Sequence, residues 1–392
     1  MKNQSKSVAF ENLFIDAMVL APEKTSGVGH LTQHLVDALI DNKTLAAHYR
    51  VRLVVPFNKA KMVRQKFGDK QVNIKKLWLP ARVIELLARL HLLPPIDIFL
   101  GRGVYLFPNY KNWPLVRSKS YTYFHDLSFI QHPEYVQPKN LRYLQRHAES
   151  WIKRSSHVLT ISKFSKEAIV KHYRISPDKI SIVYAGVDTN TFKPKTYKEI
   201  ELVCKKYSLP RSPYFLFIGN IEPRKNLERL VEAYSILPTD IKNKYGLVLI
   251  GGGGWLNDKL LNKIAKLQEN GDNIKMPSKY VSDEDLPSIY SGATALMHPA
   301  LYEGFGITPI EAMACYTPVA LSKIEPMIEV TKGAALLFNP YSVDAIKNSM
   351  LDVVTNRELR KDLKRRGAKR SKEMEWSKTT RPLVDLLIKD AK

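Results

Sequence analysis

Two carboxylates flank a Gly-Phe-Gly turn within residues 302–315, which read YEGFGITPIEAMAC. Thr308 as N-cap, Pro309 at the first helical position and Glu311 three residues after the cap predict a helix that starts with a capping box. The two glycines of the turn let the backbone approach a ligand, and the N–H groups of a helix start attract anions. This spacing predicts a phosphate site with a carboxylate on each side.

Each of the two carboxylates has a different alternative to a role in ligand binding. Glu311 either completes the capping box only or also contacts a ligand, and the residues leave both open. Glu303 precedes the turn, lies outside the predicted helix and has Tyr302 and Phe305 as neighbours. A solvated loop carboxylate is the alternative for Glu303, and we favour a role in chemistry.

A pair of cations follows the apolar run 214–219. Arg224 and Lys225 lie between Pro223 and Asn226, in the loop and first turn before a predicted helix. Cations at a helix N-terminus oppose the helix dipole, at a cost of up to about 1 kcal/mol, so an anion is expected to offset the repulsion. A diphosphate would do so, and a solvated basic loop is the alternative.

The first half of the chain offers a histidine and two glycines as candidates. His125 ends the predicted strand 120–127, and residues at the carboxyl ends of parallel strands point into a ligand crevice. Gly27 and Gly29 are expected in a turn between the strand pattern LFIDAMVL and an amphipathic helix. A structural histidine and a tight turn without a ligand are the alternatives.

Length and element order predict two α/β domains. The 392 residues are 44% hydrophobic and 25% charged, which suits a soluble protein with two cores. Alternating strands, of which 97–108 is one, and helices predict parallel sheets with right-handed crossovers. We expect domains at 1–195 and 196–372 and a final helix at 373–392. No signal-peptide core or long apolar run is found and Cys is scarce, which favours the cytosol.

The net charge of +23 is unevenly distributed. Residues 1–195 carry 31 Lys and Arg against 14 Asp and Glu, and the remainder carries 30 against 24. The first half therefore faces an anionic partner: nucleic acid, phospholipid headgroups or a phosphate-bearing acceptor. No nucleic-acid-binding motif supports the first of these.

A helix with an apolar stripe lies in the most basic segment, residues 59–93. Val83, Leu86, Leu87 and Leu90 follow helical spacing, and Arg82 and Arg89 lie away from the stripe. Such a helix either contacts a membrane surface or an acceptor, or packs in the core.

The stretches EPRKN and EGFGITPIEA resemble the motifs of retaining glycosyltransferases of the large GT-B family 4, and the resemblance covers nearly the whole chain. It implies two Rossmann-like parallel-sheet domains facing a cleft, with a last helix that crosses back to the first domain. The nucleotide-sugar donor would be held mainly by the second domain and the acceptor mainly by the first.

The resemblance also implies roles for individual residues. His125 and Glu303 would lie by the donor sugar, Glu311 would hold the ribose, and Arg224 and Lys225 would neutralise the leaving diphosphate. The full set implied to contact the donor is Gly27, Gly29, Arg224, Lys225, Tyr280, Val281, Glu303, Gly304, Phe305, Gly306, Ile307 and Glu311. Two positions depart from the family pattern: Asn220 replaces an Arg that several members carry, and Lys279 replaces the usual Gly before Tyr280.

The implied reaction is transfer of a glycosyl group with retention of configuration, without a metal or any cofactor besides the nucleotide-sugar substrate. The stretches FHDLSFIQHPEY, SKFSKEAI and VYAGVD look most like bacterial mannosyltransferases of O-antigen and capsule assembly, which use GDP-mannose. The partners would be a lipid-linked or oligosaccharide acceptor and the inner-membrane surface. A UDP-sugar donor is one alternative, and a basic nucleic-acid-binding protein is another.

Overall fold

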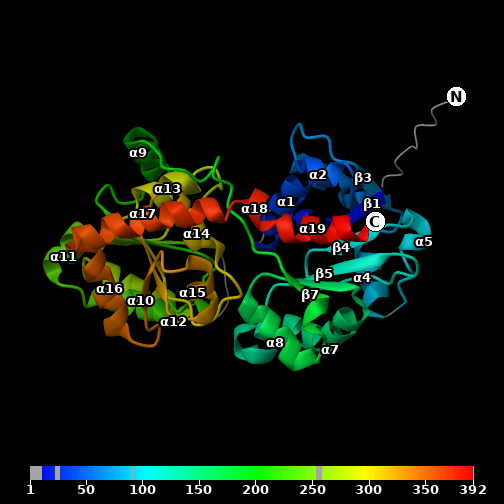
Figure 1. Ribbon diagram of the computed structural model, residues 1–392. Coiled ribbons are helices and arrows are strands. Elements are labelled where there is room, and N and C mark those ends of the chain that lie inside the picture. The colour runs from blue at the N-terminus through cyan, green and yellow to red at the C-terminus, as the bar shows by residue number, and fades with distance from the viewer. Residues whose placement is uncertain (1–10, 23–26, 91, 253–257, 392) are drawn as a thin grey trace. The chain divides into compact units, whose positions relative to one another are not determined.

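Two parallel β-sheets organise the chain (Figure 1). The computed structural model describes residues 11–22, 27–90, 92–252 and 258–391. Two compact units result: unit 1 is Met1–Ile130, Pro138–Ala185 and Trp376–Lys392, and unit 2 is Gln131–Gln137 and Gly186–Glu375. The chain therefore changes unit more than once, and its last residues return to unit 1.

Unit 1 is built on a seven-stranded sheet with the order β3-β2-β1-β4-β5-β6-β7. The strands are β1 (Glu11–Asp16), β2 (Tyr49–Pro56), β3 (Ile74–Leu77), β4 (Val104–Phe107), β5 (Lys119–Phe124), β6 (His157–Thr160) and β7 (Ile180–Ile182). Every residue of β4 is buried, as expected of a strand covered on both faces. The strand order reverses between β1 and β4, and such a reversal is where open α/β sheets bind ligands.

Helices cover both faces of this sheet (Figure 1). Before β4 they are η1 (Met18–Leu20), α1 (Gly27–Ile40), α2 (Lys43–Ala46), η2 (Phe57–Lys59), α3 (Ala60–Gln65), α4 (Ala81–Arg89) and α5 (Asp97–Leu100). After β5 come α6 (Ser128–Gln131), α7 (Pro138–Arg154), α8 (Lys163–Tyr173) and η4 (Pro177–Lys179), and the Ser162 side chain caps α8. The 3-10 helix η3 (Pro133–Tyr135) belongs to unit 2. Figure 1 shows α1, α2 and α19 on one face and α7 and α8 on the other.

The last residues belong to unit 1 as two short helices, α18 (Trp376–Thr379) and α19 (Arg381–Asp390). The Tyr49 hydroxyl donates to the Leu387 carbonyl at 2.9 Å, and the Trp376 ring stacks on His34. The sequence predicted one final helix, but the helix is interrupted at Thr380, next to Pro382 in the first turn of α19.

Unit 2 is built on a six-stranded sheet with the order β10-β9-β8-β11-β12-β13. Its strands are β8 (Tyr214–Ile218), β9 (Gly246–Ile250), β10 (Ile274–Lys275), β11 (Ala295–His298), β12 (Val319–Ser322) and β13 (Leu336–Phe338). The reversal lies between β8 and β11. At the ends of β8 and β9 a Cβ atom on Gly251 would lie 1.9 Å from the Gly219 carbonyl oxygen, so these strand ends approach closely because Gly251 lacks a side chain.

The helices of unit 2 also form two layers (Figure 1). They are α9 (Tyr197–Lys206), η5 (Pro223–Lys225), α10 (Leu227–Ser235), α11 (Thr239–Lys244), α12 (Asp258–Glu269), α13 (Leu286–Gly292), α14 (Ile307–Ala314), α15 (Glu325–Thr331), α16 (Val343–Thr355) and α17 (Arg357–Glu373). One core cluster joins α10, α12 and α16 to the sheet, with Leu230, Ile264 and Met350 among its buried residues. None of the helices in the described parts of either unit is both long and apolar enough to cross a bilayer.

The structure corrects two element predictions in unit 1. Residues 97–108 are not one strand, because Asp97–Leu100 form α5 and Gly101, with a φ of 102°, ends it before β4. The Asp97 carboxylate accepts hydrogen bonds from the N–H groups of Val116 and Arg117, which ties this short helix to a distant loop. The first strand ends at Asp16, and Met18–Leu20 turn into a 3-10 helix.

Candidate functional site

Two loops meet at the strand-order reversal of unit 2. The first follows β8 and carries Arg224 and Lys225, and the second follows β11 and carries Glu303. Asn226, with a left-handed φ of 59°, joins them: its side-chain amide donates to the Pro299 carbonyl at 3.0 Å and to the Pro340 carbonyl at 2.8 Å. The sheet thus brings together residues that are far apart in the sequence.

Glu303 is the centre of a buried ion cluster. Its Oε2 lies 2.8 Å from Arg224 Nη1, and its Oε1 contacts Lys225 Nζ. His298 Nε2 lies 3.2 Å from Oε1, and Arg224 Nη2 also pairs with Glu222 at 2.6 Å. The side chain of Glu303 is 8% exposed and that of Lys225 10%, whereas that of Arg224 is 23% exposed. Arg224 is therefore the cation of this cluster that solvent reaches most easily.

Electrostatics keep Glu303 ionised. Burial by itself would raise the pKa of Glu303, but the nearby Lys225 and Arg224 cations outweigh that effect and hold the pKa well below its usual range. Burial lowers the pKa of His298, so this ring is neutral and donates from Nε2 to the carboxylate. Glu303 can therefore accept hydrogen bonds or stabilise positive charge, but it has no proton to give.

The cluster also changes the interpretation of the two cations. Their position was expected to need an external anion, and in the structure the carboxylates of Glu222 and Glu303 already supply negative charge. They precede α10, although Asn226 separates them from its first residue. A diphosphate at Arg224 and Lys225 stays a prediction.

The predicted capping box at Glu311 is wrong. The helix α14 starts at Ile307, its N-cap is Gly306 with a φ of 89°, and no side chain caps it. A Cβ atom on Gly306 would lie 2.4 Å from Met327 Cε, so this left-handed turn requires glycine. Thr308 consequently lies inside the helix, with its hydroxyl 3.5 Å from His298 Nδ1.

Glu311 has another partner, because its Oε2 accepts a hydrogen bond from the Tyr290 hydroxyl at 2.8 Å. Burial raises the pKa of Glu311 to about 7, and the charge of Asp283 adds to the shift. The helix cap therefore does not explain this carboxyl group, and its contact with a ligand stays a prediction.

The other residues predicted to contact a donor in unit 2 differ in exposure. Gly304 and Phe305 are buried beside Glu303, and Ile307 is half-buried. Val281 is buried, whereas Tyr280 is 61% exposed and can stack on a flat ligand. Their contacts with a nucleotide stay predictions.

His125 lies in unit 1 directly after β5 and is buried. Its Nε2 lies 2.8 Å from the Pro108 carbonyl, which can only accept, so Nε2 carries the proton and Nδ1 is an acceptor. Burial lowers the pKa of His125, and its ring stacks on Tyr123. The geometry makes His125 a neutral hydrogen-bonding group.

The sequence placed Gly27 and Gly29 in a loop between a strand and a helix, but both lie within the first helical turn of α1. A Cβ atom on Gly27 would meet nothing within 4 Å, so neighbouring atoms do not require glycine there. The helix start still presents backbone N–H groups, and a phosphate contact stays a prediction.

Sequence reasoning missed two strand-end residues, His298 and Asp16. His298 ends β11 and orients Glu303, and Asp16 ends β1 with a pKa that burial raises to about 6. The signal that found His125, a polar side chain at the end of an apolar strand, was present at both positions. Within the described ranges, no group of three or more His, Cys, Asp or Glu is arranged to hold a metal ion.

Comparisons with known proteins identify the family of the chain. The family model "Glycosyl transferases group 1" matches residues 203–370, and "Glycosyltransferase Family 4" matches residues 25–191. O-antigen chain mannosyltransferase B of Escherichia coli is 32% identical over 282 residues, which cover 72% of this chain and 73% of that protein. O-antigen chain mannosyltransferase RfbU of Salmonella typhimurium is 33% identical over 228 residues, or 58% of each chain.

Among solved structures, Anabaena Alr3699/HepE in complex with UDP-glucose has a TM-score of 0.72. It covers 96% of this chain and 99% of its own, at 16% identity. At that identity the likeness shows the fold.

The first prediction concerns the ion cluster. Lys225→Met leaves the buried Glu303 carboxylate with Arg224 as its remaining cation. Removing one partner of a buried pair costs about 3–5 kcal/mol, whereas replacing both partners is often neutral. We expect Lys225→Met to lower the free energy of unfolding by about 3 kcal/mol and Lys225→Met/Glu303→Gln to recover most of it. Denaturant unfolding measures both.

The matched control is Lys259→Met, which removes the exposed Lys259–Glu228 pair and should change stability little. A double variant no more stable than Lys225→Met would show that Glu303 is not held by charge pairing.

Proposed function

The chain belongs to the glycosyltransferases of group 1 and family 4, and on that premise we propose that it transfers mannose from GDP-mannose, with retention of configuration, to a lipid-linked or polysaccharide acceptor. The enzyme class follows from the family, and the two Rossmann-like sheets are those of the GT-B fold. One observation carries the finer proposal: the relatives at 32% and 33% identity are named O-antigen chain mannosyltransferases. The product is then a cell-surface glycan such as O-antigen or capsule.

The cation pair of unit 2 supports a reaction without a metal. Arg224 and Lys225 lie in a loop at the strand-order reversal, where open α/β sheets bind nucleotides. Preorganised cations at a leaving diphosphate stabilise the charge that develops as the glycosidic bond breaks. In this proposal Arg224 and Lys225 do what a divalent cation does in other enzymes.

The two carboxylates have different roles in the donor site. Glu303, ionised and oriented by His298, accepts hydrogen bonds from the donor sugar and holds both cations in place. Glu311 holds the ribose hydroxyls while Tyr290 orients it. In unit 1, Nδ1 of His125 is available as an acceptor for a sugar hydroxyl group.

Membrane attachment is the second part of the proposal, and α4 supports it. Of the predicted stripe, Val83 is 37%, Leu86 55% and Leu90 56% exposed, so plain core packing is wrong for these three. Ile84, Leu87 and Ala88 of this helix pack in the core. Further exposed apolar side chains lie on neighbouring segments: Trp78, Leu92, Ile98 and Phe99. The rings of Trp78 and Phe99 are in contact, so these two side chains form one surface.

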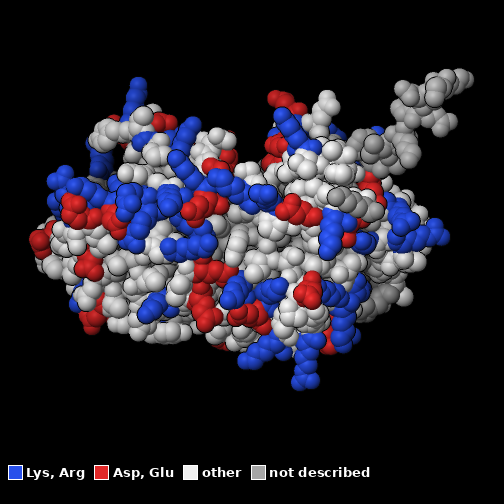
Figure 2. All heavy atoms as spheres, viewed as in Figure 1, with Lys and Arg blue, Asp and Glu red and all other residues white. Residues whose placement is uncertain are grey.

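Basic side chains lie on α7, the helix that Arg89 of α4 contacts. Arg89 of α4 lies over the Tyr143 ring of α7, which places the two helices side by side. Figure 2 shows Lys and Arg over α7 and α8, where the exposed residues include Lys139, Arg142, Arg146 and Lys153. Apolar and cationic groups together suit the inner face of a cytoplasmic membrane, because anionic lipid attracts each nearby cation by about 1 kcal/mol.

The activity prediction tests donor, mechanism and metal together. GDP should raise the melting temperature more than UDP or ADP, and GDP-mannose should yield an α-linked product on mannose oligosaccharides.

Arg224→Ala and Lys225→Ala should each lower turnover by about two orders of magnitude or more, while Lys259→Ala should not. EDTA should leave the rate unchanged. Stabilisation by UDP instead would favour a UDP-sugar donor, and activity restored only by magnesium would contradict the metal-free mechanism.

A separate prediction concerns Glu311. Because its pKa rises from 4.5 to about 7 on folding, the folded state binds more protons between these values, and stability falls as pH rises through them. Glu311→Gln should remove that fall in a pH series of melting temperatures. It should also weaken GDP binding above pH 7, where the carboxylate of the wild-type chain is ionised and accepts hydrogen bonds from the ribose hydroxyls. Unchanged GDP affinity would exclude the ribose role.

The membrane prediction uses vesicles of anionic phosphatidylglycerol and of neutral phosphatidylcholine. The protein should sediment with the anionic vesicles and be released by salt. Leu86→Ser/Leu90→Ser should weaken binding about tenfold through lost apolar burial, and Lys76→Ser/Arg82→Ser through lost charge. Leu202→Ser, an exposed leucine of unit 2, is the control. Equal binding to both vesicle types, or to neither, would contradict the proposal.

A further inference from the structure

One carboxylate ties the loop between β10 and α13, residues 276–285, to the end of α9. Asp285 Oδ2 accepts hydrogen bonds from the Tyr207 hydroxyl at 2.7 Å and from Ser282 Oγ at 2.7 Å. The same oxygen pairs with Lys206 Nζ at 2.6 Å. The Tyr207 hydroxyl in turn accepts the N–H of Ser282 at 3.1 Å. Tyr207 therefore contacts the loop through both its backbone and its carboxylate.

Asp285 does not act as a helix cap. It lies at the N-cap position of α13, where an aspartate usually accepts N–H groups of its own helix, but its side chain makes no such bond. Burial by itself would raise the pKa of Asp285, but the bonds from Lys206, Tyr207 and Ser282 outweigh it, so the pKa is lowered and the group is ionised. Lys206 is 57% exposed, and an exposed ion pair contributes little. The buried Tyr207 hydroxyl is the stronger link.

The helix α9 is a firm anchor for this loop. It begins with a complete capping box made by Thr196 and Glu199, and it packs against α13 (Figure 1). A Cβ atom on Gly292 of α13 would lie 2.8 Å from Ile200 Cγ2 of α9, so the two helices approach closely because glycine lacks a side chain. The end of α9 therefore has a fixed position relative to α13.

The loop 276–285 lies beside Glu311. The charge of Asp283 adds to the rise in the pKa of Glu311, so these two carboxyl groups are near each other. Burial raises the pKa of Tyr280, and the nearby Asp283 and Tyr207 add to this rise. The exposed Tyr280 ring and the Glu311 carboxyl group therefore belong to one region of unit 2.

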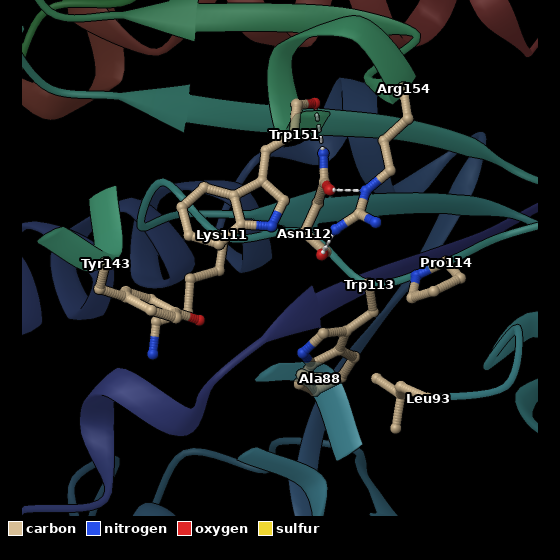
Figure 3. Close-up of a pocket in the computed structure, with 9 residues that line it drawn as sticks. All are labelled: Ala88, Leu93, Lys111, Asn112, Trp113, Pro114, Tyr143, Trp151 and Arg154. Atoms are coloured by element: carbon tan, nitrogen blue, oxygen red, sulfur yellow. Dashed lines mark hydrogen bonds between the residues drawn. The ribbon is translucent and has the colours of Figure 1, made fainter. Parts of the chain in front are cut away.

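A loop shaped by one buried polar side chain also occurs in unit 1. The side-chain nitrogen of Asn112 donates to the Trp151 carbonyl at 2.9 Å, and Arg154 donates to both oxygens of Asn112 (Figure 3). Residues of this loop and of α4, among them Glu85 and Ala88, line two adjoining cavities of about 210 Å³ and about 80 Å³. Both loops follow the carboxyl end of a strand, where parallel sheets bind ligands.

We propose that Tyr207 and Asp285 are positioning residues for the donor nucleotide, because they hold loop 276–285 in the shape that receives the base. That a nucleotide binds here rests on the proposed function. Neither residue is assigned a contact with the ligand. Without their bonds the free loop gains conformational freedom, which the ligand must remove on binding, and this cost lowers the affinity.

The test compares a ligand that has a base with one that has none. GDP and inorganic diphosphate are titrated against the full chain by calorimetry. Tyr207→Phe and Asp285→Asn should each weaken GDP binding about tenfold, because each removes a hydrogen bond and leaves a polar partner unpaired. Diphosphate binding should stay unchanged, since the cations proposed to hold it, Arg224 and Lys225, lie in another loop. A general loss of stability would lower both affinities together.

Two exposed residues provide matched controls. Tyr197→Phe changes a tyrosine of the same helix α9, and Asp344→Asn changes an aspartate in the first turn of α16. Both should leave GDP binding unchanged. In the transfer assay Tyr207→Phe should raise the donor KM and leave kcat unchanged. Hydrogen exchange of the Ser282 amide should become faster in Tyr207→Phe, because this N–H loses its acceptor.

Each outcome decides the assignment. GDP affinity that is unchanged in either variant, or that falls by the same factor as diphosphate affinity, would overturn it. A wild-type chain that binds UDP in place of GDP would contradict the proposed donor, and the same variants would then be compared with UDP and diphosphate. The failure of the donor proposal and the failure of the positioning role are therefore distinguishable. A wild-type chain that binds no nucleotide would overturn both.

Discussion

A buried carboxylate cannot remain ionised without partners, and unit 2 is arranged around that constraint at Glu303. Lys225 and Arg224 come from the loop after β8, and His298 comes from the end of β11. Because all three must reach the same carboxylate, the two loops have to lie together, and Asn226 holds them there. The pairing that keeps Glu303 charged is thus also what positions the two cations.

The same topological rule places the polar groups of unit 1. Asp16 ends β1, His125 follows β5 and the loop of Lys111 follows β4, so the charged and hydrogen-bonding side chains gather at one edge of a sheet whose strands are otherwise apolar. Parallel strands have their carboxyl ends on the same edge, and the reversal of strand order leaves space between the connecting segments. Each unit therefore has one edge suited to polar ligands.

The helix α4 shows how one short element meets three environments. Ile84 and Ala88 pack in the core and also line a cavity, Leu87 packs in the core, Glu85 lines the cavity, and Leu86 and Leu90 face solvent. Successive residues of a helix are turned by a constant angle, so side chains spaced three or four apart share a side. Leucine side chains exposed to water are unfavourable, and a lipid surface that covers them would remove this contact with water.

The sequence by itself determined the α/β class, most of the strands and the identity of Arg224, Lys225, Glu303 and His125 as candidates, because apolar runs and strand-end polar residues are local signals. It did not determine the short helix at 97–100, which is too short to show a period. It also misplaced the start of α14, because the left-handed Gly306 and its contact with Met327 depend on a later helix. Only the tertiary structure decided that Glu311 bonds Tyr290 and that His298 orients Glu303. Tyr290 and Glu311 lie on different helices, α13 and α14, and the packing that makes them neighbours is not encoded in any local stretch. His298 and Glu303 are close in sequence, but the shape of the loop that brings the ring to the carboxylate depends on contacts with the segment after β8, such as that of Asn226 with Pro299.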